Sequence, residues 1–249
     1  MTHSSTRLWP GIPVGRRASF LRSTLLSGIV LLTAACGAAQ GDAAVQATGT
    51  ASTASGPSPF APSLEPLNAG GAFAGLPGIQ SFASGQHNGQ WLIVGGRLDG
   101  LHRRQPWASF DVPGHNTRVY AVDPQTAEVW SADLSGLTAL QADQFSATNI
   151  NATQLDTVLY LVGGYGYSPS RDEHRTHPLI TAINLPGFIG AVRNGTALTP
   201  HLRRLEDEGM AVTGGQLAER GGTFYVAGGQ RFDGLYNPMG HPTHTQTYV

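Results

Sequence analysis

The sequence predicts an all-β fold built from repeated four-stranded units, and three observations support this prediction. An apolar run followed by two glycines occurs three times, as WLIVGG (91–96), LYLVGG (159–164) and FYVAGG (224–229). The first glycines of these pairs stand 68 and 65 residues apart, a spacing that indicates a repeat architecture. Further apolar runs bounded by turn residues, RVYAVDP (118–124) and LITAINLP (179–186), supply additional strands.

The first 35 residues have the layout of a secretory signal peptide. Arg7, Arg16, Arg17 and Arg22 form a basic region, and an uncharged apolar run, STLLSGIVLLTAA, follows at 23–35. This run is too short for a membrane-spanning helix, which needs about 20 apolar residues. We therefore expect residues 1–35 to direct export of the protein.

The single cysteine of the chain, Cys36, directly follows this run and the small residues Ala34 and Ala35. The segment resembles the bacterial lipoprotein signal, although Thr33 stands where leucine is commonest. The resemblance implies that Cys36 is lipidated, becomes the new N-terminus and anchors the protein in a membrane of the cell envelope. An ordinary signal peptide with an incidental cysteine is the alternative. The stretch RRASFLR (16–22) also resembles a twin-arginine export signal, with one residue more than usual after the arginines.

Residues 36–66 are expected to form a flexible linker between the anchor and the folded part. Small and polar residues dominate this stretch, and such a composition buries too little apolar surface to offset the entropy of ordering. The part of the chain after residue 35 carries eleven arginines, no lysine and sixteen acidic residues, a formal charge of −5. That charge argues against a nucleic acid as partner.

Each repeat unit begins with a polar, small-residue segment, continues with the apolar strand and its glycine pair, and then has a loop of variable sequence. In the first unit AEVWSADL (127–134) adds a strand after a turn at Pro124 and Gln125. Glycine pairs at strand ends allow close turns and close backbone approach. We therefore expect structural roles for six residues: Gly95, Gly96, Gly163, Gly164, Gly228 and Gly229.

An aliphatic strand that ends in Gly-Gly, followed by a later strand with a tryptophan such as Trp130, resembles the kelch repeat. The resemblance implies an all-β, partial kelch-like β-propeller over residues 67–249, with about two and a half to three four-stranded blades. A β-sandwich or another type of propeller is the structural alternative. A closed ring needs about four to eight blades. HTQTYV (244–249) falls where the third unit should place its next strand. We therefore expect the propeller to be truncated at its C-terminus and to self-associate through open strand edges.

Two His-x-x-His pairs are the metal-ligand candidates, namely His174 with His177 and His241 with His244. Both pairs follow a glycine pair, but no helix aligns the rings and no cysteine completes a site. The sequence contains no nucleophile-elbow motif and no phosphate-binding loop with its lysine. It therefore predicts no catalytic residue, no metal and no cofactor.

These observations favour a binding or interaction module at the bacterial cell envelope, with a protein or a carbohydrate as partner. The variable loops after the glycine pairs are expected to carry recognition, as loops on a rigid scaffold often do. The alternative is an envelope enzyme that acts on sugars and resembles the kelch-like sialic acid mutarotases. Such a site would need blades that this sequence lacks.

Overall fold

The computed structural model describes residues 63, 71–100, 105, 107–239 and 244–248. All of them belong to one unit that extends from Phe60 to Val249. Antiparallel strands account for most of the regular structure in these residues, so the predicted all-β class is confirmed. Cys36, His241, the signal peptide and nearly all of the predicted linker lie outside the described residues.

The first unit folds into a four-stranded sheet, blade 1, in which the strands follow one another in sequence order. Its strands are β1 (Ala83–His87), β2 (Gln90–Val94), β3 (Arg118–Asp123) and β4 (Glu128–Asp133). The turn between β1 and β2 consists of Asn88 and Gly89, both with positive φ. Asn-Gly is the preferred pair for this tight hairpin, because its twist matches that of the flanking strands.

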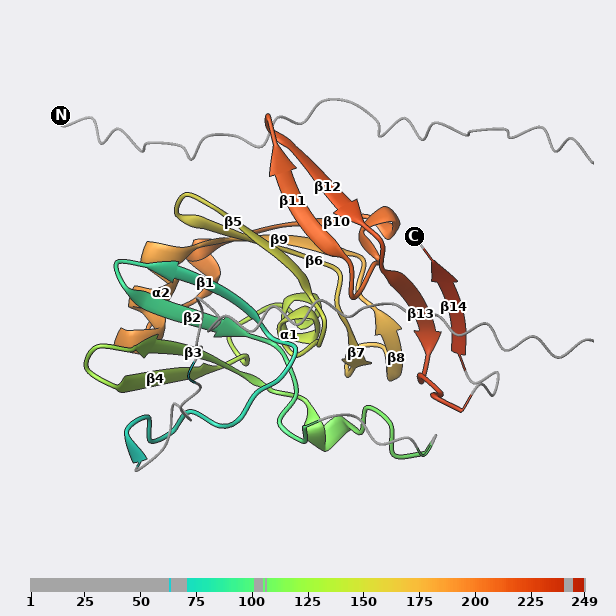
Figure 1. Cartoon of the computed structure of the whole chain (residues 1–249), viewed down its shortest axis with the longest axis horizontal. Coiled ribbons are helices and arrows are strands. Elements are labelled where there is room, and N and C mark those ends of the chain that lie inside the picture. The colour runs from blue at the N-terminus through green and yellow to red at the C-terminus, as the bar shows by residue number, and fades with distance from the viewer. Residues whose placement is uncertain (1–62, 64–70, 101–104, 106, 240–243, 249) are drawn as a thin grey trace, which may run out of the picture. The chain divides into compact units, whose positions relative to one another are not determined.

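The second unit gives blade 2, with strands β5 (Asn151–Leu155), β6 (Val158–Val162), β9 (Leu179–Asn184) and β10 (Leu202–Glu206) in the order β10-β9-β6-β5. The third unit gives the two-stranded sheet β11 (Gln216–Arg220) and β12 (Thr223–Ala227), here called sheet 3. The first strands of consecutive units are neighbours, because β5 contacts both β1 and β11. Figure 1 shows this succession from teal through yellow to orange.

The core lies between consecutive sheets. Leu92 and Val94 of β2 pack with Leu159 and Leu161 of β6 between blades 1 and 2. On the other face of β6, Val162 packs with Leu217 of β11 in a separate cluster. Successive side chains of a strand point to opposite faces. The same strand of blade 2 therefore serves both inter-sheet cores.

Two α-helices, which the sequence patterns do not predict, fill the space beside the blades. These are α1 (Ala139–Phe145) and α2 (Leu185–Asn194), whose Phe145 and Phe188 rings lie 6.0 Å apart. Helix α2 begins directly after β9, because the Asn184 side chain accepts a hydrogen bond from the Gly187 N–H and Pro186 stands in the first turn. Short 3-10 turns occur at Val112–Gly114, Thr199–His201 and Glu208–Met210.

A fourth sheet corrects the sequence-based assignment of the segments after the glycine pairs. It contains β7 (Tyr165–Ser168), β8 (Glu173–Thr176), β13 (Gln230–Gly234) and β14 (His244–Tyr248), in the order β14-β13-β8-β7 (Figure 1). The prediction placed residues 244–249 in the third blade, but β14 pairs with β13, five residues against five. Among the described residues, β12 therefore pairs only with β11.

The glycine pairs directly follow β2, β6 and β12. After the second and third pairs the chain enters the fourth sheet, as β7 and β13. All six have positive φ, in order 69°, 90°, 67°, 93°, 67° and 106°. At Gly163 a Cβ atom would lie 1.8 Å from the backbone oxygen of Val212. The backbone of the third unit thus passes directly against the glycine pair of the second.

Candidate functional site

The three segments that follow the glycine pairs pack together, and we call their described residues the post-glycine layer. These are residues 97–100, 105, 107–116, 165–178, 230–239 and 244–248. Ser109 of the first segment donates to the backbone oxygen of Tyr236 in the third, at 2.5 Å. His174 of the second segment lies with Nε2 3.0 Å from the backbone oxygen of Phe110 in the first. The segments expected to be independent loops are therefore parts of one structure.

An aromatic cluster forms the centre of the layer and draws on all three segments. Phe110, Tyr165 and Phe232 are buried together, and Tyr236 packs against them. The ring centroids of Phe110 and Tyr165 lie 5.1 Å apart, edge to face. The Tyr165 hydroxyl donates to the backbone oxygen of Gly234 at 3.0 Å and accepts from the Tyr236 N–H at 2.7 Å. Burial raises the pKa of this phenol, so it stays neutral.

Arg97, the first residue after the Gly95–Gly96 pair, is buried beside this cluster with 1% of its surface exposed. Its guanidinium pairs with Asp99, Nη2 to Oδ2 at 2.6 Å and Nε to Oδ1 at 2.8 Å, and donates to the backbone oxygen of Asp111 at 3.0 Å. It also lies over the Phe110 ring, 5.2 Å from the centroid. The third nitrogen, Nη1, has no hydrogen-bond partner among the residues that the structure describes.

The sequence contains a signal for this ion pair in a short repeated motif. RLDGL (97–101) and RFDGL (231–235) share an Arg-x-Asp-Gly pattern, and Arg231 also pairs with Asp233, Nε to Oδ1 at 3.4 Å. However, Arg97 directly follows its glycine pair, whereas Gln230 separates Arg231 from Gly229. A one-residue shift turns a strand side chain to the opposite face. The Arg231 side chain is accordingly 31% exposed and also contacts Glu208, at 2.8 Å.

We predict that Asp99→Asn lowers the free energy of unfolding by about 2 kcal/mol, because it leaves the buried Arg97 charge without its counter-ion. The Asp99 side chain is 32% exposed, which keeps the loss below that of a fully buried pair. Urea denaturation of the Cys36→Ser chain measures the change. Asp233→Asn is the matched control and should cost less than half as much, because its partner is partly hydrated. An equal loss of unfolding free energy in the two variants would contradict the interpretation that Asp99 neutralises a buried charge.

Three histidines are buried or partly buried in the layer, and burial is the main cause that lowers the pKa of each. They are His115, His174 and His177, and for His177 the pKa falls to about 3. His115 Nδ1 lies 3.0 Å from the backbone oxygen of Ser146, whereas Nε2 of His115 and of His177 has no partner. All three imidazoles are therefore neutral at pH 7, and the positive charge of Arg97 adds to this effect at His115 and His174.

The structure describes both histidines of only one of the two candidate pairs, His174 with His177, so the pair His241–His244 stays a prediction. His174 contacts Phe110, His177 is buried at the end of β8, His241 lies outside the described residues and His244 begins β14. No group of three or more His, Cys, Asp or Glu side chains is placed to hold a metal ion in the part of the chain that the structure describes.

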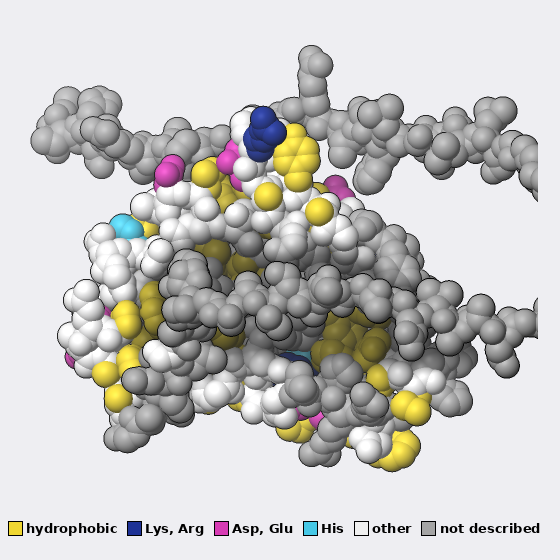
Figure 2. Space-filling view, viewed as in Figure 1, with side chains coloured by type: hydrophobic (Ala, Val, Ile, Leu, Met, Phe, Trp, Pro, Cys, Tyr) yellow, Lys and Arg dark blue, Asp and Glu magenta, His cyan; other side chains and the backbone are white. Residues whose placement is uncertain are grey.

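The surface of the layer carries large apolar side chains that sequence reasoning missed. Four of them are Trp107 (79% exposed), Met239 (61%), Val112 (46%) and Leu98 (42%). Trp107 and Met239 lie two and three residues from Ser109 and Tyr236, which a hydrogen bond joins. In the view of Figure 2, hydrophobic side chains appear at several places on the described surface, and charged ones are few.

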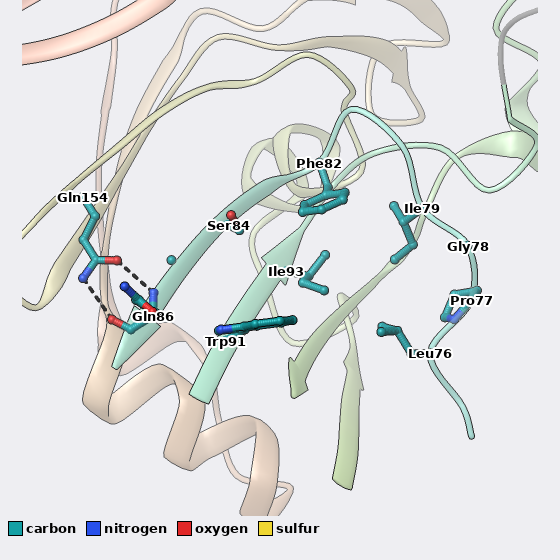
Figure 3. A pocket seen from close by; sticks show the side chains of 11 residues that line it. Leu76, Pro77, Gly78, Ile79, Phe82, Ser84, Gln86, Trp91, Ile93 and Gln154 are labelled. Atoms are coloured by element: carbon teal, nitrogen blue, oxygen red, sulfur yellow. Dashed lines mark hydrogen bonds between the residues drawn. The ribbon is translucent and has the colours of Figure 1, made fainter. Parts of the chain in front are cut away.

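A separate apolar groove of about 640 Å³ lies on the face of blade 1 that points away from blade 2. Trp91 and Ile93 of β2 form its floor, and Phe82, Leu76 and Ile79 line its side (Figure 3). At one end the Gln154 side chain bonds both backbone groups of Gln86, at 2.8 and 2.9 Å. Gln86 and Gln154 occupy equivalent positions, because 68 residues separate them as they separate Gly95 from Gly163.

In the described residues there is no helix whose length and hydrophobicity would let it cross a membrane. No protein-family model matches the chain, and no curated protein matches it. One similar solved structure, titled "Structure of YjhT", is 17% identical in sequence and matches with a TM-score of 0.39. The match covers 63% of this chain and 36% of that chain, so this chain spans about a third of that structure's length. The assignment of blades rests on the strand pairing within this chain.

Proposed function

We propose that the protein is exported, anchored through a lipid on Cys36, and binds a protein or carbohydrate partner at the bacterial cell envelope through the post-glycine layer. The exposure of Trp107 and Met239, each near the hydrogen bond that joins Ser109 to Tyr236, is the observation that carries this proposal. Exposed apolar side chains on a rigid support are typical of recognition surfaces, and tryptophan is enriched where binding energy concentrates. The kelch-like arrangement of blades supplies that support.

The alternative, an enzyme acting on sugars, requires polar groups that a substrate can reach. Arg97 has an unpaired N–H, but its side chain is 1% exposed and the Phe110 ring covers it. Asp99, the partly exposed polar group beside it, is already paired with Arg97, and the neighbouring Leu98 on the surface is apolar, which favours the binding role.

The partner is tested by photocrosslinking in intact cells with the full chain. A photoreactive phenylalanine at position 107 is expected to form an adduct with an envelope protein or glycan. Leu205 of β10, 58% exposed on blade 2, is the matched control position and should form none. Equal adducts at both positions, or none at position 107, would overturn the binding surface.

The anchor is tested separately by labelling with a palmitate analogue. We expect incorporation into the wild-type chain and none into Cys36→Ser. Absence of label in the wild type would refute the anchor and leave the binding surface untouched.

A further inference from the structure

Equivalent positions in the repeat units determine which neighbouring sheet each face of a sheet packs against. Aligned on the glycine pairs, Trp91, Leu159 and Phe224 are equivalent, and so are Leu92, Tyr160 and Tyr225. Leu159 packs toward blade 1, the preceding sheet, whereas Tyr160 packs toward sheet 3, the following sheet. We call these the preceding face and the following face.

Sheet 3 obeys the same rule in the structure. Phe224, on its preceding face, contacts Tyr160 on the following face of blade 2, with ring centroids 4.6 Å apart. Leu217 pairs with Val226 across the two strands, and Leu217 is buried in the same cluster. The contact between blades 1 and 2 and the contact between blade 2 and sheet 3 are therefore built alike. In each, the following face of one sheet packs on the preceding face of the next.

Two faces of the series have no such neighbour within the described residues. The preceding face of blade 1 is covered in part by the segment before β1, because Phe73 is buried with Ile93 and Val122. The rest of that face is the apolar groove, where Trp91 is half-buried and Phe82 is 43% exposed. The following face of sheet 3 carries Tyr225, 56% exposed, directly opposite the exposed Ala218. Figure 2 shows hydrophobic side chains on the protruding β11–β12 hairpin at the top of the view.

We propose that a second copy of the chain occupies the groove, with its Tyr225 packed on Trp91. The equivalence of positions gives the geometry, because Tyr225 corresponds to Tyr160 and Trp91 corresponds to Phe224. The new contact repeats the observed Tyr160–Phe224 contact between two chains. The following face of sheet 3 in one copy packs on the preceding face of blade 1 in the next copy. This head-to-tail contact has the same pair of faces as the contacts between sheets within one chain.

The chemistry of the two faces suits this contact. The groove is lined mainly by apolar side chains, and its volume of about 640 Å³ leaves room for an aromatic ring and its neighbours. Its polar rim consists of Ser84, Gln86 and Gln154, all exposed, which can hydrogen-bond a phenol at the edge of an otherwise apolar contact. Sheets that pack face to face lie about 10 Å apart, so a short bridging reagent can span the pair.

The test uses the full chain with Cys36→Ser, which contains no other cysteine. Two differently tagged copies are co-expressed, one with Trp91→Cys and one with Tyr225→Cys, and treated with a bismaleimide that spans about 10 Å. We expect a covalent heterodimer on a denaturing gel. The matched control replaces Tyr225→Cys with Leu205→Cys, which is similarly exposed and should give no product.

Sedimentation of variants with a single substitution gives an independent measurement. Tyr225→Arg and Trp91→Arg are each expected to weaken self-association at least tenfold, while Leu205→Arg leaves it unchanged. Circular dichroism checks that each variant is folded. A monomeric wild type at micromolar concentration would overturn the proposal. Crosslinking of position 225 to position 225, or association that survives Tyr225→Arg in the folded protein, would overturn it as well. The post-glycine layer takes no part in this contact, so the binding role is tested independently.

Discussion

Replacing Gly163 by alanine is expected to destabilise the protein by at least about 3 kcal/mol. Gly163 has a φ of +67°, which costs an alanine about 1–2 kcal/mol. The new Cβ atom would also lie 1.8 Å from the Val212 backbone oxygen, so that oxygen must move. It now accepts hydrogen bonds from the Gly164 N–H at 3.1 Å and the Asn151 side chain at 3.0 Å, and each adds about 1 kcal/mol.

Chemical denaturation of the Cys36→Ser chain measures this loss, with Gly190→Ala as the control. Gly190 lies inside α2, does not have positive φ, and has no heavy atom within 4 Å of the position that an alanine Cβ would take. Alanine there should be neutral or should stabilise by up to about 1 kcal/mol, because it favours the helix. Similar denaturation midpoints for the two variants would show that the close approach of Val212 to Gly163 does not contribute to stability.

The second large effect is loss of stability in acid, caused mainly by His177. Its folded pKa is about 3, below the ordinary value near 6.5, because its ring is buried. Below pH 6.5 the unfolded chain therefore binds a proton that the folded chain excludes, and the free energy of unfolding falls as the pH falls. At 1.36 kcal/mol per pH unit, the loss reaches about 3 kcal/mol by pH 4.5.

The variant His177→Leu isolates this contribution. His177 Nε2 has no hydrogen-bond partner, so leucine removes a titrating group without leaving a new unpaired atom. We expect the difference in unfolding free energy between the wild type and His177→Leu to change by about 3 kcal/mol between pH 7.5 and pH 4.5, in favour of the variant. Carboxylates such as Asp99, whose pKa is lowered chiefly by its hydrogen bond with Arg97, affect both proteins equally and cancel. A constant difference would show that the ring is hydrated.

Strand positions could be predicted because they depend on local patterns. The run at 118–123 is apolar over four consecutive residues and ends before a proline turn, and the structure has β3 over those residues. Helix α2 could not be predicted, because Leu185–Asn194 continues an apolar strand through a proline, with a glycine in its first turn and another inside it. Contacts of α2 with blade 1 stabilise it there, and no local pattern reports such contacts.

The segments after the glycine pairs read as loops in the sequence because their lengths and residues differ between copies. In the structure they pair with one another, as β13 pairs with β8 at Asp233 and Arg175. The candidate site therefore depends on residues that are distant in sequence. Arg97, Phe110 and Tyr165 could not be predicted as a group, since nothing in any one segment indicates what the others supply.

The sequence by itself determined the repeated strands, the glycine pairs that end them and the all-β class, because apolar runs bounded by turn residues and the φ freedom of glycine are local properties. The tertiary structure alone decided which segments pair across repeats. It placed residues 244–248 beside β13 and not in the third blade, buried Arg97 while leaving Arg231 at the surface, and kept His177 neutral. The physical reason is that burial and pairing depend on neighbours brought together by folding, and a one-residue shift along a strand is enough to exchange a buried face for an exposed one.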